Sequence, residues 1–217
     1  MLEIFKFYPK KILCNERVFF STKSNSFNNK NLIYNTMKKA TIIISSLFLF
    51  TLLFSTQATA QKFSDLDVSP LDIASYPSNY KDSNKKIKII YSRPQLKGRS
   101  LDQLAPNGKI WRTGANEAAE LILYADFYLG KTLLKAGTYT LATIPGENEW
   151  TIIVNSDLNT WGAYFYNEAN DVARISVPVT RSNSSIEAFS IAFAKSDGSV
   201  DMYMAWDTLQ VKIPFKN

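Results

Sequence analysis

The stretch Ile110–Ala118, which reads IWRTGANEA, gathers several side chains that could do chemistry. Arg112, Asn116 and Glu117 supply a guanidinium, an amide and a carboxylate beside a tryptophan. Because arginine can bind carboxylates and phosphates through two parallel hydrogen bonds, these residue types suit the capture of an anion. They would also suit a tight turn, in which Asn116 bonds its own backbone and Arg112 pairs with Glu117. The pattern therefore indicates either a ligand site or a turn.

Three further cations precede this stretch. Arg93, Lys97 and Arg99 stand next to a proline and a glycine that constrain their backbone. Residues 81–99 contain seven Lys and Arg and a single acid, which gives a local charge of +6. The structural alternative is a solvated edge strand that its lysines protect from pairing. The functional hypothesis is that the three side chains converge with Arg112 on a pocket for an anionic or polyhydroxyl ligand.

Aromatic residues are concentrated in WGAYFYNE, which contains Trp161, Tyr164 and Tyr166. If they are exposed, these rings would form a platform on which a sugar could stack, because each ring offers a flat apolar face. The alternative is that they belong to the core of a β-rich domain. The complete set of candidate ligand-binding residues is Arg93, Lys97, Arg99, Arg112, Asn116, Glu117, Trp161 and Tyr164.

The composition excludes most catalytic chemistries. The chain contains no His, and its single Cys, Cys14, lies ahead of the region that we expect to fold. Catalysis by Ser-His-Asp or Cys-His and zinc sites made of His and Cys are therefore excluded. The segment NSDLNTWGAYFY looks like a calcium loop, but Thr160 and Tyr166 stand where that loop requires Gly and Glu. We expect an Asx-rich turn there, with no metal site and no cofactor.

Carboxylate chemistry is what remains for an enzyme. A glycoside hydrolase needs two carboxyl groups roughly 5–10 Å apart. The acids near aromatic residues are Glu117, Glu120, Glu168 and Asp171, whereas the two glutamates of PGENE belong to a predicted turn. Since no spacing singles out a pair, the preferred prediction is a non-catalytic binding module for a glycan or a small anion. The alternatives are a carboxylate-dependent glycoside hydrolase and a purely structural envelope protein.

From Met37 the sequence reads MKKATIIISSLFLFTLLFSTQATAQ, which has the three parts of a secretory signal peptide. Two lysines precede an apolar core of about 16 residues, and the small residues of ATA at 58–60 form a cleavage box. We predict cleavage between Ala60 and Gln61 and export to the periplasm or the extracellular space. An uncleaved anchor is the alternative, but a membrane span needs about 20 apolar residues. Residues 1–36 are interpreted as an upstream extension from a misassigned start codon.

Removal of this leader changes the electrostatics of the protein. The first 60 residues hold 8 of the chain's 25 Lys and Arg and 2 of its 19 Asp and Glu. The remainder therefore holds 17 of each and is formally neutral, although the whole chain carries +6. A generally basic surface for nucleic acid is not supported. No membrane span is expected after cleavage.

The elements that position these residues are predicted to be short strands. We expect strands at Ile87–Ser92, Leu121–Asp126, Thr138–Ile144 and Trp150–Asn155, and one helical turn at Ser100–Leu104. Runs of this length are separated by turn residues at intervals of about 8–12, without crossover helices, which favours antiparallel pairing.

The C-terminal third alternates apolar and polar residues with a period of two, which is typical of strands with one buried face. The predicted inward faces are Val172, Ile175, Val177 and Val179; Phe189, Ile191 and Phe193; Val200, Met202, Met204 and Trp206; and Leu209, Val211, Ile213 and Phe215. Asp-Gly within SDGS at 196–199 predicts a hairpin. We expect residues 61–84 to form an exposed lead-in with room for one short edge strand, and residues 85–217 to form a single β domain. The predicted fold is an all-β antiparallel β-sandwich of about eight or nine strands, with a closed β-barrel as the alternative.

Several motifs occur in a fixed order along this domain. They are Tyr91-Ser92-Arg93-Pro94, Lys97-Gly98-Arg99, WRTGANEA at 111–118, AGTYTLATIP, EWTIIVN and WGAYFY. Together they closely resemble the bacterial family known as domain of unknown function 2911, over about residues 69–215. The resemblance implies an exported, β-rich domain. It implies no activity and supplies no catalytic residues.

Overall fold

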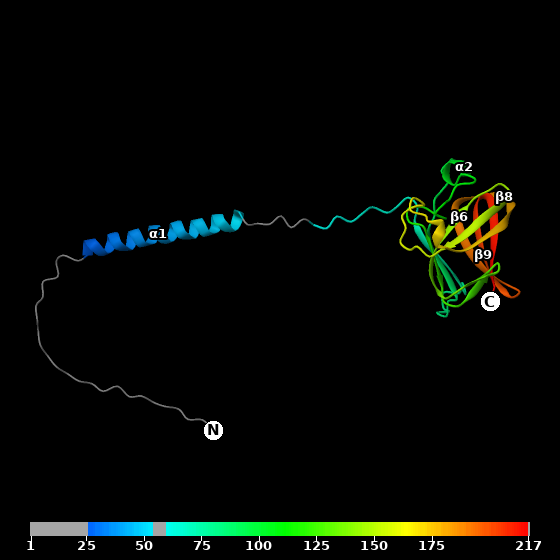
Figure 1. The fold of residues 1–217 in the computed structure, drawn as a ribbon. Coiled ribbons are helices and arrows are strands. Elements are labelled where there is room, and N and C mark those ends of the chain that lie inside the picture. The colour runs from blue at the N-terminus through cyan, green and yellow to red at the C-terminus, as the bar shows by residue number, and fades with distance from the viewer. Residues whose placement is uncertain (1–25, 54–59, 217) are drawn as a thin grey trace, which may run out of the picture. The chain divides into compact units, whose positions relative to one another are not determined.

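The computed structural model describes residues 26–53 and 60–216, which belong to two separate units. The first unit contains the helix α1 (Ser26–Leu53), and the second begins at Ser64 and contains all the strands (Figure 1). Within the described ranges, no helix combines the length and the apolar character of a membrane span. The predicted cleavage box lies largely outside these ranges, because Ala58 and Thr59 are not among the described residues.

The second unit is an all-β domain built on one continuous antiparallel sheet. Its strands are β1 (Leu71–Tyr76), β2 (Ile87–Ser92), β3 (Ala119–Leu123), β4 (Phe127–Leu129), β5 (Thr132–Leu134), β6 (Gly137–Ile144), β7 (Glu149–Asn155), β8 (Asp171–Ser196) and β9 (Ser199–Lys216). They follow the order β1-β2-β3-β6-β7-β8-β9-β4-β5. The sheet has two ends, β1 and β5, so it is not closed into a barrel.

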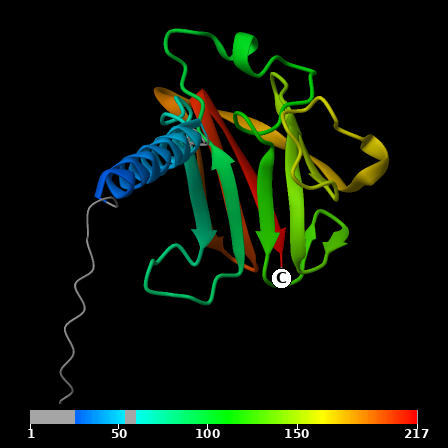
Figure 2. The same ribbon diagram turned by 90° about the vertical axis from the view of Figure 1, so that its left-hand side faces the viewer.

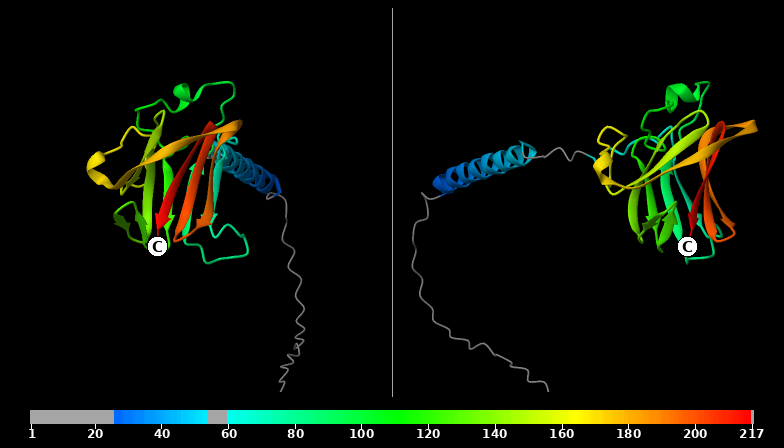
Figure 3. Two further views of the ribbon diagram at one scale, coloured as in Figure 1. Left: turned by 90° about the vertical axis from the view of Figure 1, so that its right-hand side faces the viewer. Right: turned by 45° about the vertical axis from the view of Figure 1, so that its right-hand side comes forward.

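The long strand β8 divides this sheet into the two layers of a sandwich. Its first part, through Pro178, pairs with β7, whereas the part from Val179 onward pairs with β9. Figures 2 and 3 show the two layers facing each other, with β8 running across from one to the other. On the opposite side, the segment after β2 reaches the second layer through a single antiparallel bridge between Gln95 and Ala188. The predicted antiparallel sandwich is therefore confirmed.

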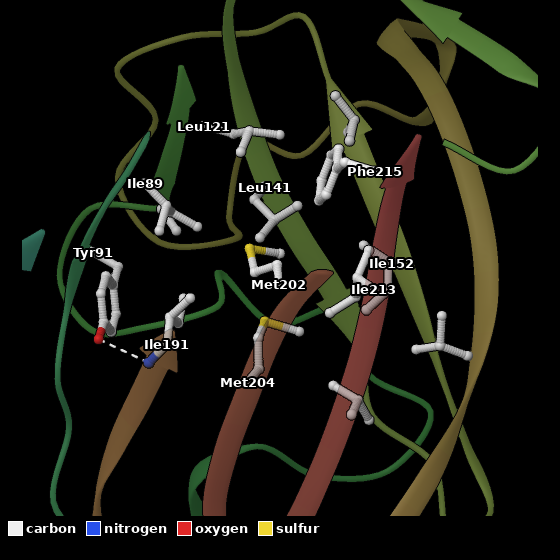
Figure 4. Packing of buried hydrophobic residues seen from close by; sticks show 14 of the residues in the cluster. Ile89, Tyr91, Leu121, Leu141, Ile152, Ile191, Met202, Met204, Ile213 and Phe215 are labelled. Atoms are coloured by element: carbon white, nitrogen blue, oxygen red, sulfur yellow. Dashed lines mark hydrogen bonds between the residues drawn. The ribbon is translucent and has the colours of Figure 1, made fainter. Parts of the chain in front are cut away.

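The strand β9 folds back on itself near its middle. Lys212 Nζ lies 3.6 Å from the carboxylate of Asp201, eleven positions away on the same strand. Asp207 has a φ of 51°, a left-handed conformation that turns the chain. Figure 4 shows one arm with Met202 and Met204 beside the other arm with Ile213. The two strands expected at 200–206 and 209–215 correspond to these arms, and β8 arches over the bend, where Ile186 pairs with Asp207.

The core lies between the layers and follows the predicted alternation closely. Met202, Met204 and Trp206 from one arm of β9 are buried, as are Val211, Ile213 and Phe215 from the other. The ring of Trp206 stacks on that of Trp111, with centroids 5.6 Å apart. One residue of the expected faces was wrong: Val172 is exposed and its neighbour Ala173 is buried. With a period of two, Ala173 shares the face of Ile175, whereas Val172 points the other way.

The connections also match the expected turns. The hairpin between β8 and β9 has Asp197 and Gly198 at its tip, and Gly198 has a φ of 67°. The helical turn α2 (Leu101–Leu104) follows Ser100, and a short 3-10 helix, η1 (Glu168–Asn170), precedes β8. The strands β4 and β5 were not predicted, because three residues are too few to display a period.

Candidate functional site

The stretch IWRTGANEA lies against the loop that follows β7. The backbone N–H of Ala118 donates to the carbonyl oxygen of Thr160 at 3.0 Å, and that of Gly162 donates to Asn116 at 3.0 Å. Between these bonds, Glu117 and Trp161 form an antiparallel bridge. Five of the eight candidate residues therefore come from two adjoining segments: Arg112, Asn116, Glu117, Trp161 and Tyr164.

The turn within this stretch depends on two left-handed residues. Thr113 and Asn116 have φ values of 56° and 61°. Gly114 is required for a different reason: a Cβ atom there would lie 2.9 Å from the carbonyl oxygen of Ser92, which belongs to backbone and cannot yield easily. Trp111 is structural, because its ring is buried and its indole N–H donates to the carbonyl oxygen of Gly114 at 3.1 Å. The turn interpretation thus holds for the tryptophan and the glycine.

The loop after β7 exposes an aromatic platform, by which we mean Leu158, Trp161, Tyr164 and Phe165. The exposed fractions of the three aromatic residues are 54%, 80% and 73%. Gly162, with a φ of 66°, lies directly beneath the ring of Tyr164, since an added Cβ would be 2.8 Å from that ring. The three rings are therefore exposed to solvent, and the turn at Gly162 is closely packed against the ring of Tyr164.

A polar network anchors the loop that carries this platform. The carboxylate of Asp171 accepts hydrogen bonds from Asn155 Nδ2 at 2.9 Å, Tyr166 Oη at 2.7 Å and an Arg174 Nη at 2.8 Å. Burial and the bond to Asp171 raise the pKa of Tyr166 to about 12. The loop itself closes through an Asx turn, in which the N–H of Asp157 donates to Asn155 Oδ1. The expected Asx-rich turn is confirmed.

Arg112 lies behind the platform without an acidic partner. Within the described ranges it forms no ion pair with Glu117, because Glu117 is exposed in its bridge to Trp161. Arg112 Nε is buried and has no hydrogen-bond partner among the described residues. It lines a small cavity of about 20 Å³ together with Asp157 and Tyr166. A cavity of this volume has room for about one water molecule, so it is too small for a sugar.

The other three cations lie elsewhere, and the guanidinium groups of Arg93 and Arg99 are bonded to the protein itself. Arg93 donates from Nε to the carbonyl oxygen of Phe189 at 3.0 Å and from its two Nη atoms to Asp72 at 3.0 Å and Ser190 Oγ at 2.6 Å. The structure therefore uses Arg93 to join β1 to β8. Arg93 does not reach the cavity beside Arg112, and neither Lys97 nor Arg99 lines that cavity.

Arg99 and Lys97 belong to the loop that follows β2. The guanidinium of Arg99 donates to the carbonyl oxygens of Leu96 at 3.0 Å and Gln95 at 2.8 Å, both in its own loop. Lys97 has a φ of 48°, and its backbone N–H donates to Glu187 Oε1 at 2.7 Å. The guanidinium of Arg99 thus stabilises the conformation of the loop, and the backbone of Lys97 joins the loop to Glu187 of β8.

The acids considered for hydrolysis are partly accounted for. Glu168 and Asp171 both form ion pairs with Arg174, at 3.2 and 2.8 Å. Across the described ranges, no three residues among Asp, Glu, His and Cys are grouped as metal ligands would be. These two acids therefore hold the loop before β8 in place.

A polar cleft that the sequence did not indicate lies at another edge of the domain. It has a volume of about 330 Å³ and is bordered by Asp102, Glu147 and Asp207, with Arg181 nearby. Trp150 forms part of its wall, and the buried indole N–H of that residue has no partner among the described residues. The acids come from three turns far apart in the chain, so only the fold brings them together.

Comparison with known proteins relates this domain to a sequence family. No curated protein and no solved structure matches the chain. One family does match, over residues 70–215, and this range covers β1 to β9 almost completely. The motifs WRTGANEA and WGAYFY, which form the turn and the aromatic platform, lie within it. The chain therefore belongs to the family described as protein of unknown function DUF2911.

Proposed function

We propose that this domain is a non-catalytic binding module for a glycan, which it holds on the aromatic platform. The observation that carries the proposal is the exposure of Trp161, Tyr164 and Phe165 on one anchored loop. Exposed apolar patches with polar surroundings commonly mark interaction sites. A sugar ring presents C–H groups on its faces, and these match flat aromatic rings.

Polar groups beside the rings support a glycan as the ligand. Residues opposite each other in an antiparallel bridge place their side chains on the same face. Glu117 is bridged to Trp161 and is exposed, so its carboxylate is available to accept hydrogen bonds from sugar hydroxyls. A small anion is less well supported, since the guanidinium groups of Arg93 and Arg99 already donate to protein oxygens. We propose further that the domain is exported, to the periplasm or beyond, through the leader that ends at Ala60.

A glycan array tests the proposal, followed by titration calorimetry with the best glycan. We expect Trp161→Ala to weaken binding at least tenfold, about 1.4 kcal/mol, without lowering the melting temperature. Tyr80→Ala is the control, because Tyr80 is an exposed aromatic residue that lies outside the platform. Binding that survives Trp161→Ala and Tyr164→Ala together would refute the platform as the site.

The polar cleft supports a second candidate, a carboxylate-dependent glycoside hydrolase. Asp102, Glu147 and Asp207 all border this cleft and come from different segments, as paired catalytic acids often do. A panel of chromogenic glycosides tests the candidate. Turnover that is lost in Asp102→Asn or Glu147→Gln but kept in Glu168→Gln would favour it, and the absence of turnover on the whole panel would leave the binding module.

A further inference from the structure

A groove of about 580 Å³, separate from the polar cleft, opens where β8 leaves β9. β8 pairs with β9 only as far as Val179, which lies opposite Val211. β4 joins the same strand farther along, where Leu129 lies opposite Phe215. Between these two pairings β8 has turned away toward β7. The hollow lies beside the stretch of β9 that pairs with neither β8 nor β4. Its volume is within the range of small-molecule sites.

The exposed lining of this groove is mostly apolar. Ile175, Val177, Pro178 and Pro214 contribute to it. Gly130 shapes one wall, since a Cβ atom there would lie 2.8 Å from Ile175 Cγ2. These groups come from two strands, β8 and β9, and the tight turn after β4, so the hollow is a feature of the packed domain. It is suited to a hydrocarbon chain.

The charged residues that line the groove are both cations. They are Lys212 and Lys216, and both side chains are exposed. The nearby acid Asp201 is buried and already bonded, because it accepts from Ser199 Oγ at 2.8 Å and pairs with Lys212. Because Lys212 is paired with Asp201, an anionic head group at the rim would meet the uncompensated positive charge of Lys216.

We propose that this groove binds a single-chain anionic amphiphile, with the hydrocarbon chain on the apolar floor and a carboxylate beside Lys216 and Lys212. A peptide strand fits the groove less well. The open stretch of β9 between the two pairings comprises only Lys212, Ile213 and Pro214. Pro214 has no N–H with which to bond an added strand. Apolar contact and charge, rather than backbone pairing, are what the groove offers.

The experiment measures the fluorescence of 11-(dansylamino)undecanoic acid with the purified domain, below the micelle concentration of each competitor. We expect saturable binding of one probe per domain. Laurate should displace the probe at a concentration at least tenfold lower than dodecanol or dodecyltrimethylammonium requires. Equal displacement by the three compounds would overturn the role of the lysines, and the absence of saturable binding would overturn the site.

Matched variants locate the site. Lys216→Glu should weaken probe binding several-fold, whereas Lys195→Glu, an exposed lysine of β8 outside the groove, should not. Ser176→Trp should fill the groove and abolish binding, with Ala194→Trp as the control at another exposed position of β8. Lys212 is left intact because it is the partner of buried Asp201.

The melting temperature of each variant shows whether it is folded. Binding that persists in both folded Lys216→Glu and folded Ser176→Trp would place the amphiphile elsewhere. The outcome is independent of the glycan proposal, because Trp161→Ala should leave probe binding unchanged.

Discussion

Replacement of Arg93 by alanine should destabilise the domain markedly. This guanidinium joins Asp72 of β1 to the backbone of Phe189 and the hydroxyl of Ser190 in β8. Through these bonds Arg93 ties the edge strand of one layer to the other layer. The sequence analysis placed this residue in a ligand site, so the substitution also separates a structural role from a binding role.

The expected magnitude follows from the three contacts. The side chains of Arg93 and Asp72 are 34% and 41% exposed, so their ion pair contributes at most about 1 kcal/mol. The bonds to Phe189 and Ser190 have a charged donor and together contribute about 2–3 kcal/mol. We therefore expect Arg93→Ala to lower the free energy of unfolding by about 2–4 kcal/mol. In a domain of this size that corresponds to a loss of about 5–12 °C in Tm.

Urea unfolding followed by tryptophan fluorescence measures this loss, because Trp111 and Trp206 are stacked in the core. Asp72→Asn should cost less than about 1 kcal/mol, since it removes only the exposed ion pair. Arg99→Ala is the control, because its guanidinium bonds only to its own loop. If Arg93→Ala costs no more than Asp72→Asn, the two bonds to β8 contribute nothing and the reasoning fails.

Three further predictions concern pH, metals and processing. The pKa of Tyr166 is raised to about 12 in the folded state, whereas an unfolded tyrosine ionises near pH 10. The contribution of Tyr166 to the free energy of unfolding is therefore complete below about pH 10 and is lost as the pH rises toward 12. Urea titrations at pH 8 and pH 11 should show that the free energy of unfolding falls less between these two values in Tyr166→Phe than in the wild type. EDTA should leave the melting temperature unchanged, and a drop of several degrees would reveal an oxygen-only metal site. Exported protein should begin at Gln61 by intact-mass analysis, and material that retains Met37 would contradict the predicted cleavage.

The fold could be predicted from the sequence because most of its strands have one buried face. Such faces produce the alternation that identified Ile87–Ser92 at its exact bounds and the inward residues of both arms of β9. The alternation does not report where a strand changes partner. The crossing of β8 at Val179 therefore appears only in the structure, whereas the bend at Asp207 coincides with the predicted break between Trp206 and Leu209.

Only part of the candidate site could be predicted from the sequence, namely the two motifs that one backbone bridge brings together. The bridge between Glu117 and Trp161 brings together the two motifs that the sequence had singled out. The convergence of the cations was not predictable, because residue type does not tell which acceptors a guanidinium will find. Arg93 found oxygens of β8 and β1, and Arg99 found carbonyl groups in its own loop. The polar cleft and the apolar groove depend on distant turns and strand ends, so they leave no local signal.

The path of β8 has a consequence for how this domain can come apart. One strand supplies an edge to β7 in the first layer and to β9 in the second. If β8 separates from one layer, the hydrogen bonds that it makes in the other layer are therefore weakened as well. The two layers form one cooperative unit in spite of their separate faces, and no cut within β8 would release a half that keeps its own complete sheet. In a chain without cysteine in this region, β8 connects the layers in the way that a disulfide does in cysteine-rich domains.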